Sequence, residues 1–97
     1  MGATVHVIAR FVAKAGKEAA LEKVLTALIA PSRREVGCYQ YDLLVNPKDP
    51  RDFCFVERWD DDEALDQHAA TEHLKLARAG FEDLVETPPD IRRYRII

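Results

Sequence analysis

The stretch ERWDDDEALDQHAATEH, from Glu57 to His73, contains the transition that decides the fold. It begins at the end of an alternating apolar segment, and its acidic run is typical of the start of a helix. Asp60 followed by Glu63 resembles a capping box, in which the aspartate accepts a hydrogen bond from a free amide of the first turn. We therefore expect a strand to end at Trp59 and a helix to begin directly after it.

The segments upstream predict a first strand and a first helix. Residues 4–12 alternate, and one face of this strand holds Val5, Val7, Ala9 and Phe11. Apolar residues between 21 and 29 recur at the spacing of an amphipathic helix. Pro31 lacks the amide proton that continues a helix, so we expect this helix to end or kink near Ala30.

A hairpin is predicted between this helix and the opening stretch. Residues 38–45 and 53–59 read as its two strands, and residues 46–52 are dense in turn formers and read as its loop. Alternation puts Tyr39 and Tyr41 on the same face, where they can donate to a ligand oxygen or lie at a subunit interface.

The remaining segments complete the order β, α, β, β, α, β. Thr71 can cap a second helical segment whose apolar stripe runs to Val85, and residues 90–97 alternate as a closing strand. This order predicts one α+β domain over residues 1–97, with a ferredoxin-like four-stranded antiparallel sheet and helices on one face. Because the other face would stay half solvated, we expect a homodimer.

The composition argues against several classes of protein. The 97 residues are 47% hydrophobic and carry a formal net charge of -3, and the basic residues are scattered. A nucleic-acid interface needs a concentrated basic face, so we expect none. No apolar run approaches the ~20 residues that cross a bilayer, and the N-terminus does not read as a signal peptide, so we expect a cytoplasmic protein. Cys38 and Cys54 lack metal or redox spacing and read as buried, reduced thiols.

His68 and His73 are the first candidates for chemistry. As a metal pair they are weak, because a spacing of five on a helix rotates the second side chain by about 140° and no Cys or third His stands at ligand spacing. His68 falls on the face that packs against the sheet, where an imidazole can accept a proton from a bound phenol or acidic carbon. The alternative is a structural, half-buried histidine bonded to a backbone carbonyl.

Glu57 and Trp59 are the next candidates, on the aromatic face of the second hairpin strand. A carboxylate on that face must be paired or have a raised pKa, and we expect a salt bridge to Arg10 or Arg58, with a catalytic base as the alternative. Trp59 provides a large apolar wall, which reads either as core or as a surface for a ligand ring.

Four stretches together resemble the antibiotic biosynthesis monooxygenase family. They are ARF at 9–11, AGK at 15–17, PSRREVGCYQY at 31–41 and FVERWDDDEALDQHAATEH at 55–73. The resemblance covers essentially the whole chain and implies a dimeric α+β barrel with a substrate pocket between the sheet and the helices of each subunit. It implies a pocket lined by Val7, Ala9, Trp59, His68 and His73. Glu57, Tyr39 and Tyr41 are further candidates for substrate contacts because of their polar groups.

The activity that the resemblance implies is oxidation of a small aromatic quinol or anthrone by dioxygen without metal or flavin. His68 would accept or anchor a proton, His73 would be a secondary polar contact, and Trp59 would pack on the substrate ring. Heme-degrading relatives place an asparagine where Ala9 stands, which disfavours that chemistry here. Anthrone oxygenases place an asparagine where Phe55 stands, so their mechanism is not copied directly.

Two further functions stay open at this point. One is a proton-transfer isomerase acting on a small metabolite, whose phosphate the C-terminal residues Arg92, Arg93 and Arg95 would hold. The other is a non-catalytic, stress-response barrel that binds a hydrophobic ligand and uses its histidines only structurally. Oxygen uptake, turnover without oxygen, and stabilisation by ligand without turnover separate the three.

Overall fold

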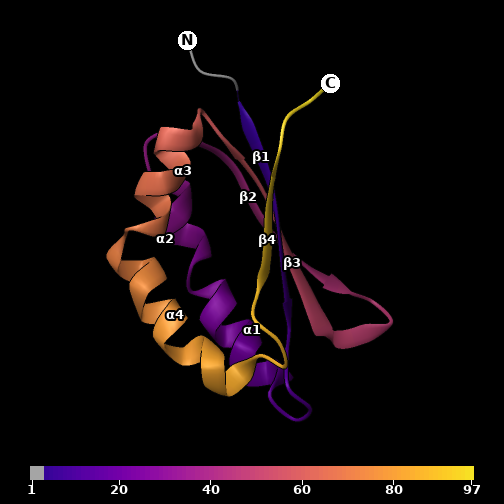
Figure 1. Cartoon of the computed structure of the whole chain (residues 1–97). Coiled ribbons are helices and arrows are strands. Elements are labelled where there is room, and N and C mark those ends of the chain that lie inside the picture. Colours follow the sequence, from indigo (N-terminus) through magenta and orange to yellow (C-terminus); the bar gives the residue numbers. More distant parts are fainter. Residues whose placement is uncertain (1–3) are drawn as a thin grey trace.

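The computed structural model describes residues 4–97 and contains a four-stranded antiparallel sheet with helices packed on one of its faces (Figure 1). The strands are β1 (Val5–Val12), β2 (Cys38–Asn46), β3 (Asp49–Trp59) and β4 (Asp90–Tyr94), in the spatial order β2-β3-β1-β4. The helices are α1 (Glu18–Thr26), α2 (Ile29–Arg33), α3 (Asp62–Ala69) and α4 (Glu72–Leu84). This arrangement confirms the predicted ferredoxin-like α+β fold.

The core lies between the sheet and the helices, as the alternation predicts. Val5, Val7, Ala9 and Phe11 of β1 are buried, and so are Phe53, Phe55, Glu57 and Trp59 of β3. The two strands pair with Val7 opposite Glu57 and Ala9 opposite Phe55, so these two sets form one continuous inner face. The inner face therefore contains one carboxylate in a wall of apolar side chains.

The first helical region breaks earlier than the proline predicts. α1 ends at Thr26 and α2 begins at Ile29, so Pro31 lies inside α2. Pro31 is in the first turn of α2, where an amide has no partner within the helix, so the missing proton does no harm there. The short α2 ends at Arg33, and Glu35 lies in the segment between α2 and β2.

The hairpin loop is shorter than its composition predicts. β2 continues to Asn46 and β3 begins at Asp49, which leaves only Pro47 and Lys48 as the turn. The polar side chains satisfy the backbone at the strand ends: Asn46 Oδ1 accepts from the amide of Lys48 at 2.9 Å. The predicted loop over residues 46–52 was therefore wrong, because turn-forming residues also occur at the ends of paired strands.

A bulge near the start of β2 separates the two tyrosines that alternation put on one face. Cys38 pairs with Trp59 and Gln40 with Arg58, so Tyr39 has no partner of its own on β3. Tyr41 then points inward and is 2% exposed, whereas Tyr39 is 54% exposed. The prediction of a shared face was wrong because an extra residue shifts the alternation.

The helix after Trp59 begins one residue later than predicted. Asp61, not Asp60, is its N-cap, and its carboxylate accepts from the amide of Ala64 at 2.9 Å. Asp60 instead accepts a hydrogen bond from the Tyr39 hydroxyl at 2.9 Å. Thr71 caps α4 as predicted, and the break between Ala69 and Glu72 turns the chain between the two histidines.

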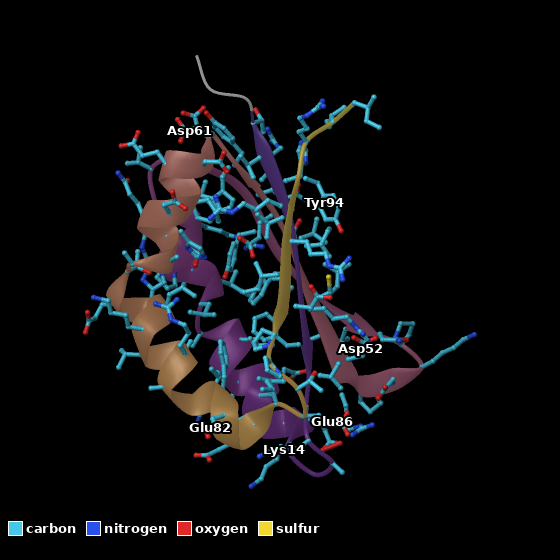
Figure 2. All side chains as sticks on the ribbon, in the orientation of Figure 1. Lys14, Asp52, Asp61, Glu82, Glu86 and Tyr94 are labelled. Carbon is cyan, nitrogen blue, oxygen red and sulfur yellow. The ribbon has the colours of Figure 1, made fainter. Side chains whose placement is uncertain are left out.

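The outer face of the sheet carries no helix (Figure 1). On this face, the side chains of Ile8, Leu44 and Tyr94 are each more than a third exposed. Figure 2 shows Asp52 and Tyr94 on the side of the sheet away from the helices. The closing strand ends at Tyr94, short of the predicted end at Ile97. Within residues 4–97, no helix has the length and apolar character needed to cross a membrane.

Gly37 follows the first helical region in the chain and packs against the start of α3. Its φ is +87°, a conformation that side chains with a Cβ rarely adopt. A Cβ at this position would meet Ala64 Cβ at 2.9 Å, and the Gly37 carbonyl accepts from the amide of Asp60 at 2.8 Å. The close approach brings the segment that contains Glu35 against α3.

We expect Gly37→Ala to destabilise the protein more than Gly16→Ala does. Gly16 also has a positive φ, of +82°, but nothing lies within 4 Å of its missing Cβ. Each substitution should cost about 1–2 kcal/mol of backbone strain, and only Gly37→Ala should add about 1–3 kcal/mol for the clash. Urea unfolding of both variants measures the difference, and equal losses would show that the close approach to Ala64 carries no energy.

Candidate functional site

A cavity of about 120 Å³ lies between the inner face of the sheet and the helices. Most of its lining is apolar, and its polar members are Tyr41, Glu57, His68, Arg78 and Arg93. The cavity lies where the predicted pocket was placed. Of the residues predicted to form the site, Val7, Ala9, Tyr41, Glu57 and His68 are in the lining of this cavity.

One carboxylate oxygen is within hydrogen-bond distance of both candidate histidines. Glu35 Oε2 lies 2.8 Å from His68 Nδ1 and 2.7 Å from His73 Nε2. The three side chains come from the segment after α2, from α3 and from the first turn of α4. His68 is buried, and the other two are partly buried, with side chains 16% (Glu35) and 24% (His73) exposed. The structural alternative of a bond from His68 to a backbone carbonyl is therefore replaced by a bond to Glu35.

The local structure explains why the three residues meet. The helix break after Ala69 changes the chain direction, so the rotation of a continuous helix does not separate the two rings. Because Gly37 has no side chain, the segment that contains Glu35 can pack closely against the start of α3. Sequence reasoning did not single out Glu35, because it stands outside any periodic face. Its only signal was its place in the PSRREVGCYQY stretch at 31–41.

The hydrogen bond to Glu35 fixes the tautomer of His68. A carboxylate only accepts, so Nδ1 of His68 carries the proton. The opposite nitrogen, Nε2, has no hydrogen-bond partner among residues 4–97, and the imidazole lines the cavity. Burial lowers the pKa of His68, and the bond to Glu35 opposes that shift. A neutral imidazole with a free Nε2 is a proton acceptor.

Glu57 has a different partner from the predicted arginines. Its Oε1 accepts from Trp59 Nε1 at 2.9 Å, and the side chain is buried in the inner face. Burial raises the pKa of Glu57 to about 7, although the Trp59 hydrogen bond opposes this. Arg10 instead pairs with Asp52 at 2.8 Å, and Arg58 lies over the ring of Tyr39 on the other side of the sheet. The predicted salt bridge was wrong, because both arginines belong to the outer face.

Three predicted site residues lie outside the cavity lining. Trp59 is fully buried, and its ring lies 4.5 Å from the His68 imidazole, so it supports that ring rather than contacting a ligand. His73 reaches the cavity only through Glu35. Tyr39 is exposed on the other side of the bulge. Cys38 and Cys54 are free thiols, and both are half-buried rather than buried.

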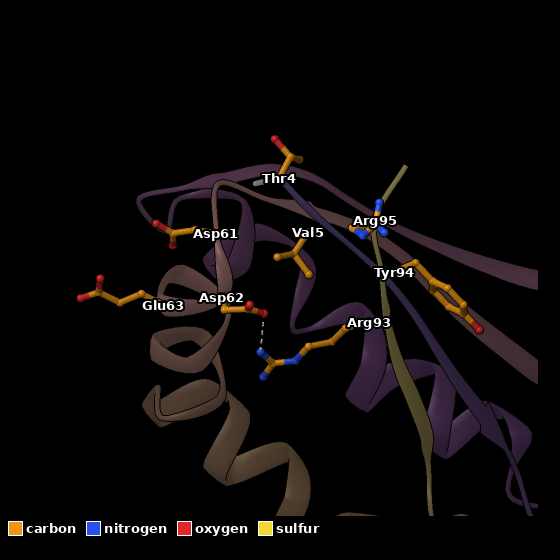
Figure 3. Close-up of a pocket in the computed structure, with 8 residues that line it drawn as sticks. All are labelled: Thr4, Val5, Asp61, Asp62, Glu63, Arg93, Tyr94 and Arg95. Atoms are coloured by element: carbon orange, nitrogen blue, oxygen red, sulfur yellow. Dashed lines mark hydrogen bonds and ion pairs between the residues drawn. The ribbon is translucent and has the colours of Figure 1, made fainter. Parts of the chain in front are cut away.

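Two arginines lie at the mouth of the cavity. Arg93 of β4 donates to Asp62 of α3 at 2.8 Å (Figure 3). It also donates to Asp66 of α3 at 2.7 Å. Arg78 of α4 donates to the carbonyl of Ala69, and no carboxylate among the described residues pairs with it. A larger hollow of about 460 Å³ lies beyond Arg93, between α3 and the end of β4, and is lined mainly by charged side chains. Tyr41, Glu57 and His68, whose pKa values are shifted mainly by burial, line the smaller cavity.

Comparison with known proteins identifies the family. The model of the family described as "Antibiotic biosynthesis monooxygenase" matches residues 4–80. "Putative monooxygenase Rv0793" of Mycobacterium tuberculosis is 36% identical over 88 residues, which cover 91% of this chain and 86% of that protein. The crystal structure of PA3566 from Pseudomonas aeruginosa is 39% identical with a TM-score of 0.94 and covers 100% of this chain and 97% of that one.

A further crystal structure, described as an antibiotic biosynthesis monooxygenase, agrees with this match. It is 30% identical with a TM-score of 0.90, over 96% of this chain and 98% of that one. The family match covers most of the sheet and all of the residues that build the cluster of Glu35 and the two histidines. The chain therefore belongs to the antibiotic biosynthesis monooxygenase family.

Proposed function

We propose that the protein is a monooxygenase that oxidises a small hydroquinone with dioxygen and uses neither metal nor flavin for this reaction. The observation that carries the proposal is the 2.8 Å hydrogen bond from His68 Nδ1 to Glu35, which leaves Nε2 as a proton acceptor at an apolar cavity. Family membership and the name of the Mycobacterium tuberculosis relative support monooxygenation as the reaction class.

The first step is removal of a phenolic proton by His68 Nε2. The resulting quinolate is electron-rich and transfers one electron to dioxygen, which gives a semiquinone and superoxide. The two radicals combine through a carbon–oxygen bond to a peroxide. Glu35 stabilises the imidazolium that forms on His68, because its carboxylate already accepts the Nδ1 proton.

The second stage is loss of water from the peroxide. The His68 imidazolium returns its proton to the peroxide, and a protonated Glu57, which lines the same cavity, supplies the second proton to the departing oxygen. The proton lost from the ring carbon then restores the Glu57 acid. In total, one hydroquinone and one dioxygen give one hydroxyquinone and one water. The apolar lining excludes bulk water from the charged intermediates.

The cavity size favours one aromatic ring over three. An engineered protein cavity of about 150 Å³ holds benzene, and the volume here is about 120 Å³. A three-ring anthrone, or a flavin beside a substrate, would need the walls to move. Phe55 fills the wall at the position where anthrone oxygenases place an asparagine, which fits the smaller substrate.

The phosphorylated-metabolite isomerase has less support in the C-terminal arginines. Arg92 is bound to Asp90 at 2.9 Å, and Arg93 is bound to two carboxylates of α3. A phosphate would have to displace these carboxylates before it could bind. The ligand-binding barrel needs no such change and remains the non-catalytic alternative.

The first test is oxygen consumption by chelator-treated protein with hydroquinone, a naphthoquinol and an anthrone. We expect uptake above the rate without protein, fastest with the single-ring substrate. His68→Ala should lower kcat by about 10²- to 10⁴-fold, because it removes the proton acceptor. Glu35→Gln should lower kcat less, because its amide oxygen still accepts from Nδ1 but no longer balances the imidazolium charge.

His6→Ala is the matched control for the histidine variant. His6 lies on β1 but faces away from the buried side, so its loss should leave the rate unchanged. Full activity in His68→Ala would rule out the proposed proton acceptor. Absence of uptake with all three reductants, together with thermal stabilisation by them, would favour the ligand-binding barrel.

We further propose that two copies pair through the outer face of the sheet. The inner face is covered by helices, and the outer face keeps Ile8, Leu44 and Tyr94 partly exposed beside charged residues. Burying these side chains against a second copy removes apolar surface from water.

Ile8→Glu should shift the protein from dimer to monomer. Ile8 is 39% exposed on the outer face. In the dimer, a carboxylate at this position would lose its water and would lie near the same carboxylate of the second copy, across the two-fold axis. Leu76→Glu is the control, because Leu76 is 70% exposed on the helical side. Light scattering after gel filtration gives the mass, and a wild-type monomer would refute the pairing.

The protonation of Glu57 can be tested through stability. Because its pKa rises from 4.5 to about 7 on folding, the native state binds more protons than the unfolded state between these values. The free energy of unfolding should therefore fall as pH rises through this window, by at most about 3 kcal/mol from this group. Glu57→Gln keeps an acceptor for Trp59 and should gain stability relative to wild type between pH 5 and pH 8. An equal difference at both pH values would contradict the raised pKa.

A further inference from the structure

We propose that Glu35, His68 and His73 form a binding site for a divalent transition-metal ion, with Zn²⁺ as the best fit. This goes beyond the proposed oxygenase, which needs no metal. The donor atoms are one carboxylate oxygen and two imidazole nitrogens, and all three lie within 4.8 Å of one another. Two imidazoles and one carboxylate form a known ligand set for zinc with an open fourth position.

The three donors converge on one point from three segments. Glu35 Oε2 is 2.8 Å from His68 Nδ1 and 2.7 Å from His73 Nε2. Ligands at 2.0–2.1 Å from a tetrahedral ion are roughly 3.3 Å apart. To admit the ion, the carboxylate oxygen has to withdraw by about half an ångström, and the two imidazole nitrogens, which lie within 4.8 Å of each other, have to turn toward the same point. Glu35 lies between α2 and β2, outside any helix or strand.

The structure removes the geometric argument against the histidine pair. On a continuous helix, His68 and His73 would point in different directions, and no third ligand stands near them in the sequence. Here the chain turns between α3 and α4, and the third ligand comes from Glu35, 33 residues before His68. Because the two histidines lie on different helices, they can bind the same ion without the i, i+4 spacing that a single helix requires.

An ion can reach this site from solvent. The side chains of His73 and Glu35 are 24% and 16% exposed, whereas His68 is buried behind them. A surface hollow of about 340 Å³ between α1 and α4 includes His73 in its lining. A water molecule at the fourth position would face this side.

Zinc and proton acceptance by His68 would exclude each other, a consequence that rests on the proposed function. Zinc bound to Nδ1 displaces the proton that Glu35 now holds there. A neutral imidazole must then carry its proton on Nε2, so the nitrogen at the cavity becomes a donor. A bound ion would therefore inhibit the oxygenase rather than assist it.

The deciding experiment is calorimetric titration of chelator-treated protein with ZnCl₂ in the absence of substrate. We expect one ion per chain, and a loss of affinity of at least tenfold in His73→Ala and in Glu35→Gln. His6→Ala and the double variant Cys38→Ser/Cys54→Ser should keep the wild-type affinity. His73 is partly exposed, so its variant is expected to fold, and thermal unfolding without zinc checks this.

Cobalt provides a second readout of the same site. Co²⁺ in a four-coordinate site should give intense visible absorption in wild type that is lost in His73→Ala. No saturable zinc binding below 1 mM, unchanged affinity in a folded His73→Ala, or loss of affinity in the cysteine variant would each overturn the proposal. Because the titration contains no substrate, its outcome is independent of oxygen uptake. If zinc inhibits oxygen uptake and EDTA restores it, the metal site and the proposed proton acceptor share His68.

Discussion

A single carboxylate at the end of the first helical region organises the site. Glu35 accepts hydrogen bonds from an imidazole of α3 and an imidazole of α4, so it ties three segments together. Hydrogen bonds to a charged group contribute about 1.5–3 kcal/mol each in proteins. Removal of this carboxylate would leave two partly or fully buried imidazole groups without their partner, which costs more than the loss of an exposed ion pair.

Burial shifts the pKa values of two groups of the cavity in opposite directions. It raises the pKa of Glu57 to about 7 and lowers the pKa of His68, because the charged form is disfavoured in each case. Both shifts favour the neutral forms, so Glu57 is the group that can donate a proton and His68 is the group that can accept one. The apolar packing that forms the core thus favours the protonation states that the proposed acid–base chemistry requires, and the Trp59 ring contacts both groups.

The sequence was sufficient for the fold and for part of the site. Alternation identified the inner faces of β1 and β3, and the position of His68 after Leu65 placed its ring on the packed side. The failures have physical causes. The bulge at Tyr39 adds a residue without a partner on β3, which shifts the inward–outward alternation of β2. Glu35 contacts His68 because Gly37 allows its segment to approach α3 closely. Contacts between segments far apart in the chain leave no periodic signal, so the partner of each histidine was not predictable.

The cavity offers a substrate few polar groups. The family resemblance implies asparagines at two of its positions in some members, and this chain has Ala9 and Phe55 there, both in the cavity lining. Under the proposed function, the polar contacts for a substrate oxygen would come from His68, Glu57 and Tyr41 and from Arg78 and Arg93, which line the same cavity. A single ring with oxygens at opposite ends would place one oxygen at His68 and leave the other for a second polar group. A para-hydroquinone has two such oxygens on one ring, whereas an anthrone would add two further rings to a cavity of about 120 Å³.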